Sequence, residues 1–127
     1  MSTNTKSTPL EALKDQTILI FEDMHFIRGH WVQYAKDHDY QTVYAFSSWE
    51  EFVAQNAFSL AENAVAFVDI RYHGSRYNGV DIAGRLRELG IRKMYAITAD
   101  PEFARASGLF DDVFGKEVPA QFERLLG

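Results

Sequence analysis

Short apolar segments alternate with amphipathic ones along the chain, and this alternation is the feature that most constrains the fold. Five segments are continuously apolar, β-branched or aromatic and are predicted to be strands: 17–21, 41–46, 64–68, 93–98 and 112–115. Helices are predicted between and after them, at 26–38, from Ser48, at 79–90, at 101–107 and after Pro119. This alternation predicts an α/β fold, a doubly wound parallel sheet covered on both faces.

Local signals mark where several of these helices begin and end. Ser48 with Glu51 three positions later is typical of a capping box. Asp100-Pro101 is typical of an N-cap followed by a first-turn proline. Gly90 is suited to ending the helix predicted at 79–90. The helix that opens at Pro101 is predicted to be short and to end at about Ser107.

Composition fits one domain and argues against several classes of protein. The chain has 127 residues and is 46% hydrophobic, enough for one core, and its polar residues 1–15 are predicted to be a flexible leader before a domain at 16–127. The absence of cysteine excludes disulfides and favours a cytoplasmic location. No apolar run approaches the roughly 18 residues of a membrane span. A net charge of −5 without a basic cluster indicates no direct nucleic-acid binding.

Polar residues stand at the carboxyl ends of four predicted strands. Glu22 and Asp23 follow the first strand, Asp69 ends the third, Thr98 ends the fourth and Lys116 follows the fifth. In open parallel sheets, ligands bind beyond the carboxyl ends of the strands, near the point where the strand order reverses. We therefore expect these five side chains to meet in one shallow pocket.

This set of residue types suits a phosphoryl group and a divalent cation. Three neighbouring carboxylates repel one another unless a cation lies between them, and oxygen-only ligands favour a hard ion such as Mg²⁺. Lys116 would add positive charge and Thr98 a hydroxyl hydrogen bond. Asp69, on the central strand, is then best placed to act as a nucleophile and become an acyl phosphate.

The segments that carry these residues resemble the response-regulator receiver domain of two-component signalling. They are FED at 21–23, VDI at 68–70, ITA at 97–99 and FGKEVP at 114–119, and the resemblance covers about residues 17–126. It implies a three-layer (βα)5 flavodoxin-like fold with strand order 2-1-3-4-5.

The resemblance also implies a role for each site residue. Asp69 would be phosphorylated by a sensor histidine kinase or phosphotransfer protein and would hold Mg²⁺ with Glu22, Asp23 and the backbone carbonyl of Arg71. Thr98 and Lys116 would bind the phosphoryl oxygens: these two residues and Asp69 form the implied catalytic set. Such a domain is not an enzyme with turnover. It relays a signal to a downstream protein or to an output domain that this chain lacks.

Several positions depart from the family pattern. His73 stands where the family usually has a proline, and the loop between Asp69 and Gly79 is about two residues longer. Val113 occupies a position that often carries Tyr or Phe, and the neighbouring Phe114 is expected to point to the opposite face. The segment from Thr98 to Lys116 is about four residues shorter than in the family, so a shortened fourth helix is expected. Glu117 replaces a common proline. These changes concern the output surface and leave the acceptor residues in place.

Two other functions stay open on the sequence alone. One is a pseudo-receiver, the same fold used as an interaction or dimerisation module without phosphorylation. The other is an enzyme that turns over a small phosphorylated substrate. A homodimer is also left open, because the shortened fourth helix either exposes Phe103, Leu109 and Phe110 or folds them inward.

Overall fold

The computed structural model describes residues 16–37, 39–40, 42–72 and 74–115. Within them five parallel strands form one sheet in the order β2-β1-β3-β4-β5. The strands are β1 (Thr17–Phe21), β2 (Thr42–Phe46), β3 (Val65–Asp69), β4 (Lys93–Ile97) and β5 (Asp112–Phe114). The predicted α/β class, parallel sheet and strand order are confirmed.

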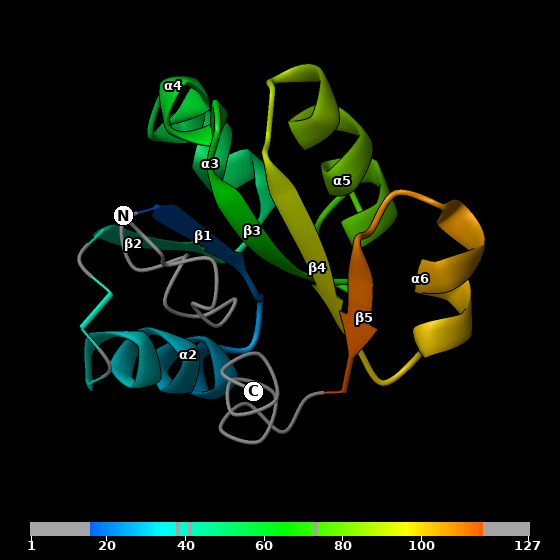
Figure 1. Cartoon of the computed structure of the whole chain (residues 1–127). Coiled ribbons are helices and arrows are strands. Elements are labelled where there is room, and N and C mark those ends of the chain that lie inside the picture. The colour runs from blue at the N-terminus through cyan, green and yellow to red at the C-terminus, as the bar shows by residue number, and fades with distance from the viewer. Residues whose placement is uncertain (1–15, 38, 41, 73, 116–127) are drawn as a thin grey trace, which may run out of the picture.

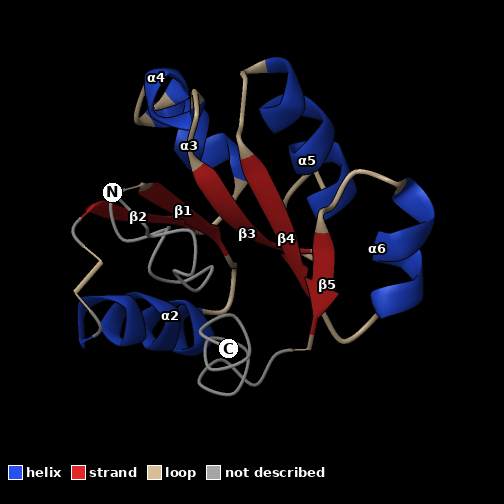
Figure 2. Ribbon diagram, viewed as in Figure 1, coloured by secondary structure: helices blue, strands red, loops and turns tan. Residues whose placement is uncertain are grey.

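Helices cover both faces of the sheet and complete three layers (Figures 1 and 2). The described helices are α2 (His25–Asp37), α3 (Trp49–Ala54), α4 (Phe58–Ala61), α5 (Gly79–Glu88) and α6 (Pro101–Ser107). Only α2 among them packs on one face, where its Trp31 lies in a core with Ile18 and Ile20 of β1. On the other face Leu19 and Phe21 pack with residues of α3, α4 and α5.

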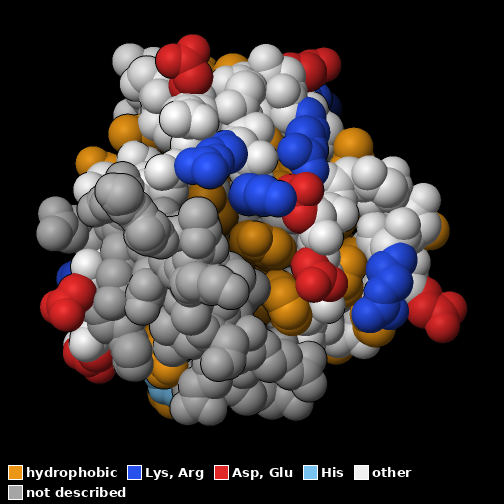
Figure 3. All heavy atoms as spheres, in the orientation of Figure 1, with side chains coloured by type: hydrophobic (Ala, Val, Ile, Leu, Met, Phe, Trp, Pro, Cys, Tyr) orange, Lys and Arg blue, Asp and Glu red, His pale blue; other side chains and the backbone are white. Residues whose placement is uncertain are grey.

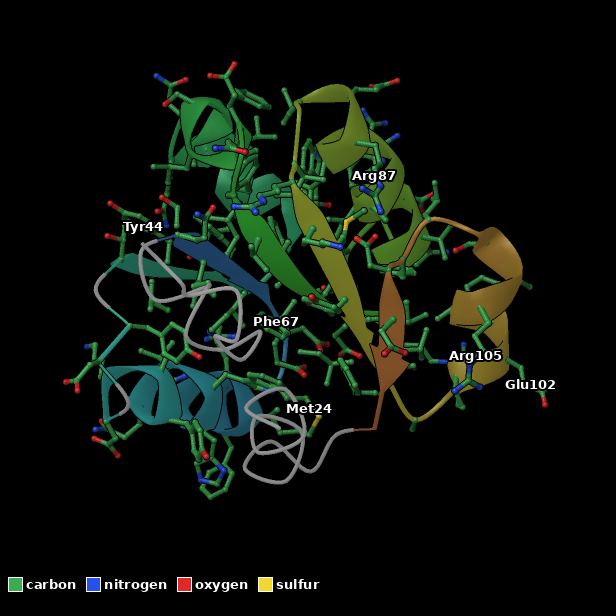
Figure 4. The ribbon with its side chains drawn as sticks, in the orientation of Figure 1. Met24, Tyr44, Phe67, Arg87, Glu102 and Arg105 are labelled. Carbon is green, nitrogen blue, oxygen red and sulfur yellow. The ribbon has the colours of Figure 1, made fainter. Side chains whose placement is uncertain are left out.

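The central strands are buried on both faces, which explains their continuous apolar sequence. Every residue of β3 is buried, and side chains along it alternate between the two faces. Phe67 points towards α2, with its ring centroid 5.1 Å from that of Trp31. It is labelled in Figure 4. Asp69 is therefore an ionisable residue at the end of a strand that is otherwise apolar.

The connection from β2 to β3 contains two short helices where one was predicted. The predicted cap is present, since the Ser48 hydroxyl accepts from the Glu51 amide at 3.1 Å. The Glu51 carboxylate accepts from the Ser47 amide instead of the cap residue's own amide. Asn56 then adopts a left-handed conformation (φ 55°), which interrupts the helical hydrogen-bond ladder and separates α3 from α4.

Helix α5 has the predicted start and end. The Asn78 side chain accepts from the Asp81 amide at 2.9 Å and the Asp81 carboxylate accepts from the Asn78 amide at 3.0 Å, a complete capping box. Gly90 follows the helix with a φ of 87°. Near the end of α5, Arg87 (Figure 4) donates to the Leu109 carbonyl at 2.6 Å and ties the helix to the segment before β5.

Helix α6 follows β4 and is therefore the fourth helix of the predicted (βα)5 pattern. It has only seven residues, which confirms the prediction that this helix is short. Pro101 opens it as predicted, but the Asp100 side chain makes no capping hydrogen bond and pairs with Arg71 instead. Phe103 is 44% exposed, whereas Leu109 and Phe110 pack against the core. The apolar residues of this region are therefore divided between surface and interior.

Several predictions fall on residues outside the described ranges. They concern the leader at 1–15, the helix after Pro119, and the residues Lys116, His73 and Glu117. Among the described helices, none combines the length and apolar character that crossing a bilayer requires. On the face shown in Figure 3, Lys and Arg side chains lie among Asp and Glu side chains.

Candidate functional site

The carboxyl ends of the strands bring buried polar side chains to one edge of the sheet. In Figure 1 the arrowheads of β3, β4 and β5 point towards this same lower edge. The buried polar or charged side chains of the described residues are Glu22, Asp69 and Thr98, which are 0%, 1% and 3% exposed. Each lies at or directly after the end of a strand. Burying an ionisable group is costly without compensation, so their convergence marks a candidate site.

Three carboxylates form the centre of this site, which we call the acidic cluster. Oxygens of Glu22, Asp23 and Asp69 all lie within 4.8 Å of one another. Like charges at this separation disfavour the ionised forms unless a cation offsets them. The donors are all oxygens, and two of the three residues are buried. The cluster therefore fits a hard divalent cation such as Mg²⁺.

Backbone hydrogen bonds fix the strand end that carries two of these carboxylates. The Glu22 amide donates to the Phe46 carbonyl at 3.0 Å and continues the pairing of β1 with β2. The Met24 amide donates to a Glu22 carboxylate oxygen at 3.1 Å. Arg28 on α2 donates to the backbone carbonyls of Glu22 at 2.7 Å and Asp23 at 3.2 Å. The turn after β1 is thus held from the strand and from the helix.

Asp69 and Thr98 share a small cavity beside the acidic cluster. The cavity has a volume of about 70 Å³ and is lined by Asp69, Arg71, Thr98, Ala99 and Asp100. The Thr98 amide donates to the Phe114 carbonyl of β5 at 2.8 Å. Its hydroxyl accepts from the Asp100 amide at 2.8 Å. The structure therefore brings Thr98 beside Asp69.

The other two predicted site residues are Arg71 and Lys116. The Arg71 side chain is 73% exposed, and its guanidinium lies 2.5 Å from the Asp100 carboxylate. This ion pair links the loop after β3 to the loop after β4, and the sequence contains no local signal for it, because the partners are far apart in the chain. Lys116 is outside the described residues.

Tyr72 is a residue of the site that the sequence analysis did not identify. Its hydroxyl donates to the Phe21 carbonyl at 2.8 Å. Burial raises the pKa of Tyr72 well above its usual range, and the carboxylates of Asp69, Glu22 and Asp23 raise it further. The phenol thus stays protonated beside the acidic cluster. No local sequence pattern indicates this contact, because its two partners lie 51 positions apart.

A larger groove opens next to the acidic cluster on the side of β2. Its volume is about 550 Å³, and its lining includes Asp23, Met24, Ser47, Glu50 and Ser75. Met24 is labelled in Figure 4 and is 48% exposed. The groove gives Asp23 an open side, while Glu22 and Asp69 lie deeper.

Val113 and Phe114 point to opposite faces of β5, as predicted. Phe114 belongs to the core on the side of α2. Val113 packs on the other side against Ala96 and Ala104. Val113 therefore presents a small apolar side chain on this face of β5.

Comparisons with known proteins identify the fold. No family model and no curated protein matches the sequence. The receiver domain of NtrX from Brucella abortus is 19% identical with a TM-score of 0.67, over 86% of this chain and 97% of that one. A CheY-like response regulator receiver domain protein from Methanospirillum hungatei JF-1 is 19% identical with a TM-score of 0.65, over 86% and 89%.

Longer proteins contain the same fold as a part. This chain covers 26% of a longer NtrX chain, at 18% identity and a TM-score of 0.69. It covers 66% of a response regulator from Burkholderia pseudomallei, at 18% identity and a TM-score of 0.68, whose structure contains a phosphorylated aspartic acid and a calcium ion. The chain therefore has the fold of response-regulator receiver domains.

Proposed function

We propose that this protein is a phosphoacceptor receiver domain, reversibly phosphorylated on Asp69 in the presence of Mg²⁺. The observation that carries the proposal is the acidic cluster, with its oxygens within 4.8 Å at the carboxyl edge of a receiver-type sheet. The small cavity that Asp69 shares with Thr98 supports it further. The response regulator from Burkholderia pseudomallei, which this chain resembles over 66% of its length, contains a phosphorylated aspartic acid and a calcium ion, and this supports the proposal.

The proposed reaction is the transfer of one phosphoryl group. A carboxylate oxygen of Asp69 forms a bond to phosphorus while the bond from phosphorus to the donor breaks, and the donor leaves with that electron pair. Glu22, Asp23 and Asp69 would hold Mg²⁺, which supplies positive charge that offsets the charge of the phosphoryl oxygens. The Thr98 hydroxyl would donate to one of those oxygens, and Lys116 is proposed to neutralise another.

The donor is proposed to be the phosphohistidine of a sensor kinase or phosphotransfer protein. The protein would not turn over a substrate; its product is its own acyl phosphate, read by a downstream partner or output domain. If the Thr98 side chain rotates towards the phosphoryl group, its hydroxyl would lose the hydrogen bond that it accepts from the Asp100 amide at 2.8 Å. That change would directly affect the start of α6, because Asp100 immediately precedes Pro101, the first residue of the helix.

Phosphorylation of the intact protein tests the proposal. The protein is incubated with acetyl phosphate and Mg²⁺, and its intact mass is measured. We expect a gain of one phosphate that requires Mg²⁺ and disappears in Asp69→Asn. The matched control is Asp37→Asn, on the exposed end of α2, which should be phosphorylated as the wild type is. A folded wild type that gains no phosphate, or an Asp69→Asn protein that gains as much, contradicts the proposal.

A pseudo-receiver is the second candidate, favoured by one specific observation. The Arg71–Asp100 ion pair joins two residues that line the cavity beside Asp69 and Thr98. If this pair kept donors out, the fold would act as a constitutive interaction module. In that case the wild type would gain no phosphate while Arg71→Ala would gain it, under the same conditions and with the same fold by circular dichroism.

A further inference from the structure

One hydrogen bond joins the two strand ends that carry the acidic cluster. Tyr72 lies in the loop that follows Asp69, and its hydroxyl donates to the carbonyl of Phe21, 51 positions away, at 2.8 Å. Phe21 is the last residue of β1 and directly precedes Glu22. The bond therefore connects the segment after the acceptor aspartate to the segment before the other two carboxylates.

This bond lies beyond the last paired residues of the two strands. β1 and β3 pair from Ile18 opposite Val65 to Phe21 opposite Val68, and the register ends there. On its other side, β1 continues one step further, with the Glu22 amide bonded to β2. Tyr72 thus supplies a cross-connection towards β3 at the point where the acidic residues begin.

Packing restrains the tyrosine ring in this position. The ring packs against the core cluster that includes Phe21, Val68 and Ile82. An aromatic side chain has only two rotatable bonds, so a packed ring holds its hydroxyl at low entropic cost. Three carboxylates within 4.8 Å repel one another and favour separation of the strand ends. The hydrogen bond opposes that separation.

We propose that Tyr72 is a positioning residue that holds the ends of β1 and β3 together and so keeps the acidic cluster in a geometry ready for a divalent cation. The inference rests on the proposed function and deepens it. Residues that orient metal ligands without touching the metal commonly strengthen metal binding. Tyr72 would act in this way through the backbone, by fixing the strand ends from which the ligands project.

The test compares cation binding in Tyr72→Phe and the wild type. Phenylalanine keeps the packed ring and removes only the hydroxyl. Binding is measured with Mn²⁺ alone, from the electron paramagnetic resonance signal of the free ion. We expect the dissociation constant to rise about tenfold, the scale of one lost organising hydrogen bond at a metal site. The Mg²⁺ concentration for half-maximal phosphorylation should rise by the same factor, while the rate at saturating Mg²⁺ stays near the wild-type value.

Tyr77→Phe is the matched control, because Tyr77 lies in the same loop but its ring packs against α5, with the Arg85 guanidinium 4.7 Å from its centroid. It should bind Mn²⁺ as the wild type does. Replacing Tyr72 by 4-aminophenylalanine, which keeps a donor at the same ring position, should restore binding. A merely structural role would lower the melting temperature of Tyr72→Phe without changing the Mn²⁺ affinity of the folded protein.

Two results would overturn the inference while leaving the proposed function intact. The first is that the wild type binds Mn²⁺ and gains phosphate, and that Tyr72→Phe binds Mn²⁺ with the same affinity. The other is a folded 4-aminophenylalanine protein that binds weakly although its donor is kept, and this result decides the matter even if Tyr72→Phe fails to fold. A wild type that neither binds Mn²⁺ nor gains phosphate overturns the proposed function, and the inference falls with it.

Discussion

Gly79 shows how closely the backbone around Asp69 is packed. Its amide donates to the Ile70 carbonyl at 2.7 Å. A Cβ atom added there would lie 2.1 Å from the backbone oxygen of Asp69 and 2.7 Å from the Cα of Ile70. No real contact is this short, and both neighbours are backbone atoms that a rotamer change cannot move. Glycine is therefore required by the close approach of α5 to the end of β3.

Gly79→Ala should lower the free energy of unfolding by roughly 2 kcal/mol, the scale of an overpacked site, and should slow phosphorylation of Asp69 because its backbone must shift. Urea unfolding and the intact-mass assay measure the two effects. Gly84→Ala is the control on the same helix, where nothing lies within 4 Å of the added Cβ. It should gain up to about 1 kcal/mol from helix propensity. Equal stability of the two variants would show that the close approach is absent.

At the scale of elements, the loop between β3 and α5 is held from three directions. Arg71 reaches the loop after β4, and Tyr72 reaches the end of β1. The Glu50 carboxylate on α3 accepts from the Ser75 hydroxyl at 2.7 Å and from the Arg76 amide at 3.2 Å. The loop is thus anchored to its neighbours at several points along its length.

The anchor on Glu50 should be visible in its titration. The hydrogen bond from Ser75 lowers the pKa of Glu50, and the bond from the Arg76 backbone contributes as well. Because the folded pKa is lowered, this contact stabilises the fold above the unfolded pKa and is lost as the pH falls through the folded one. In Ser75→Ala, the Glu50 midpoint followed by carboxyl NMR should move up towards its ordinary value. Ser59→Ala, exposed on α4, is the control, and an unmoved midpoint in Ser75→Ala would contradict the anchor.

These elements also show what a sequence can and cannot predict. The gathering of Glu22, Asp69 and Thr98 follows from topology, since parallel strands bring their carboxyl ends to one edge. The bonds from Tyr72 to Phe21 and from Arg71 to Asp100 join positions 51 and 29 residues apart. Such pairs depend on how two loops fold against each other, and no local pattern encodes that.

At the scale of the whole molecule, three buried tyrosines make the stability of the fold depend on pH in the alkaline range. Tyr40 and Tyr95 lie in the core on the side of α2, and Tyr72 lies at the carboxyl edge. Burial raises the pKa of each, and nearby groups add to the shift: Tyr34 for Tyr40, the acidic cluster for Tyr72, and the carboxylates of Asp111 and Asp112 for Tyr95. The folded state thus keeps phenol protons that the unfolded chain gives up.

The free energy of unfolding should therefore fall as the pH rises above about 10, the ordinary pKa of tyrosine. Below that pH both states hold the protons and the stabilisation is complete; above it only the folded state does, so the slope is negative. Each tyrosine contributes at most about 1.4 kcal/mol per pH unit. Urea unfolding across this range measures the slope, which should become shallower in Tyr40→Phe. Tyr44→Phe, at an exposed position on β2 (Figure 4), is the control. A Tyr40→Phe protein with the wild-type slope would mean that the Tyr40 phenol ionises as easily inside the fold as outside it.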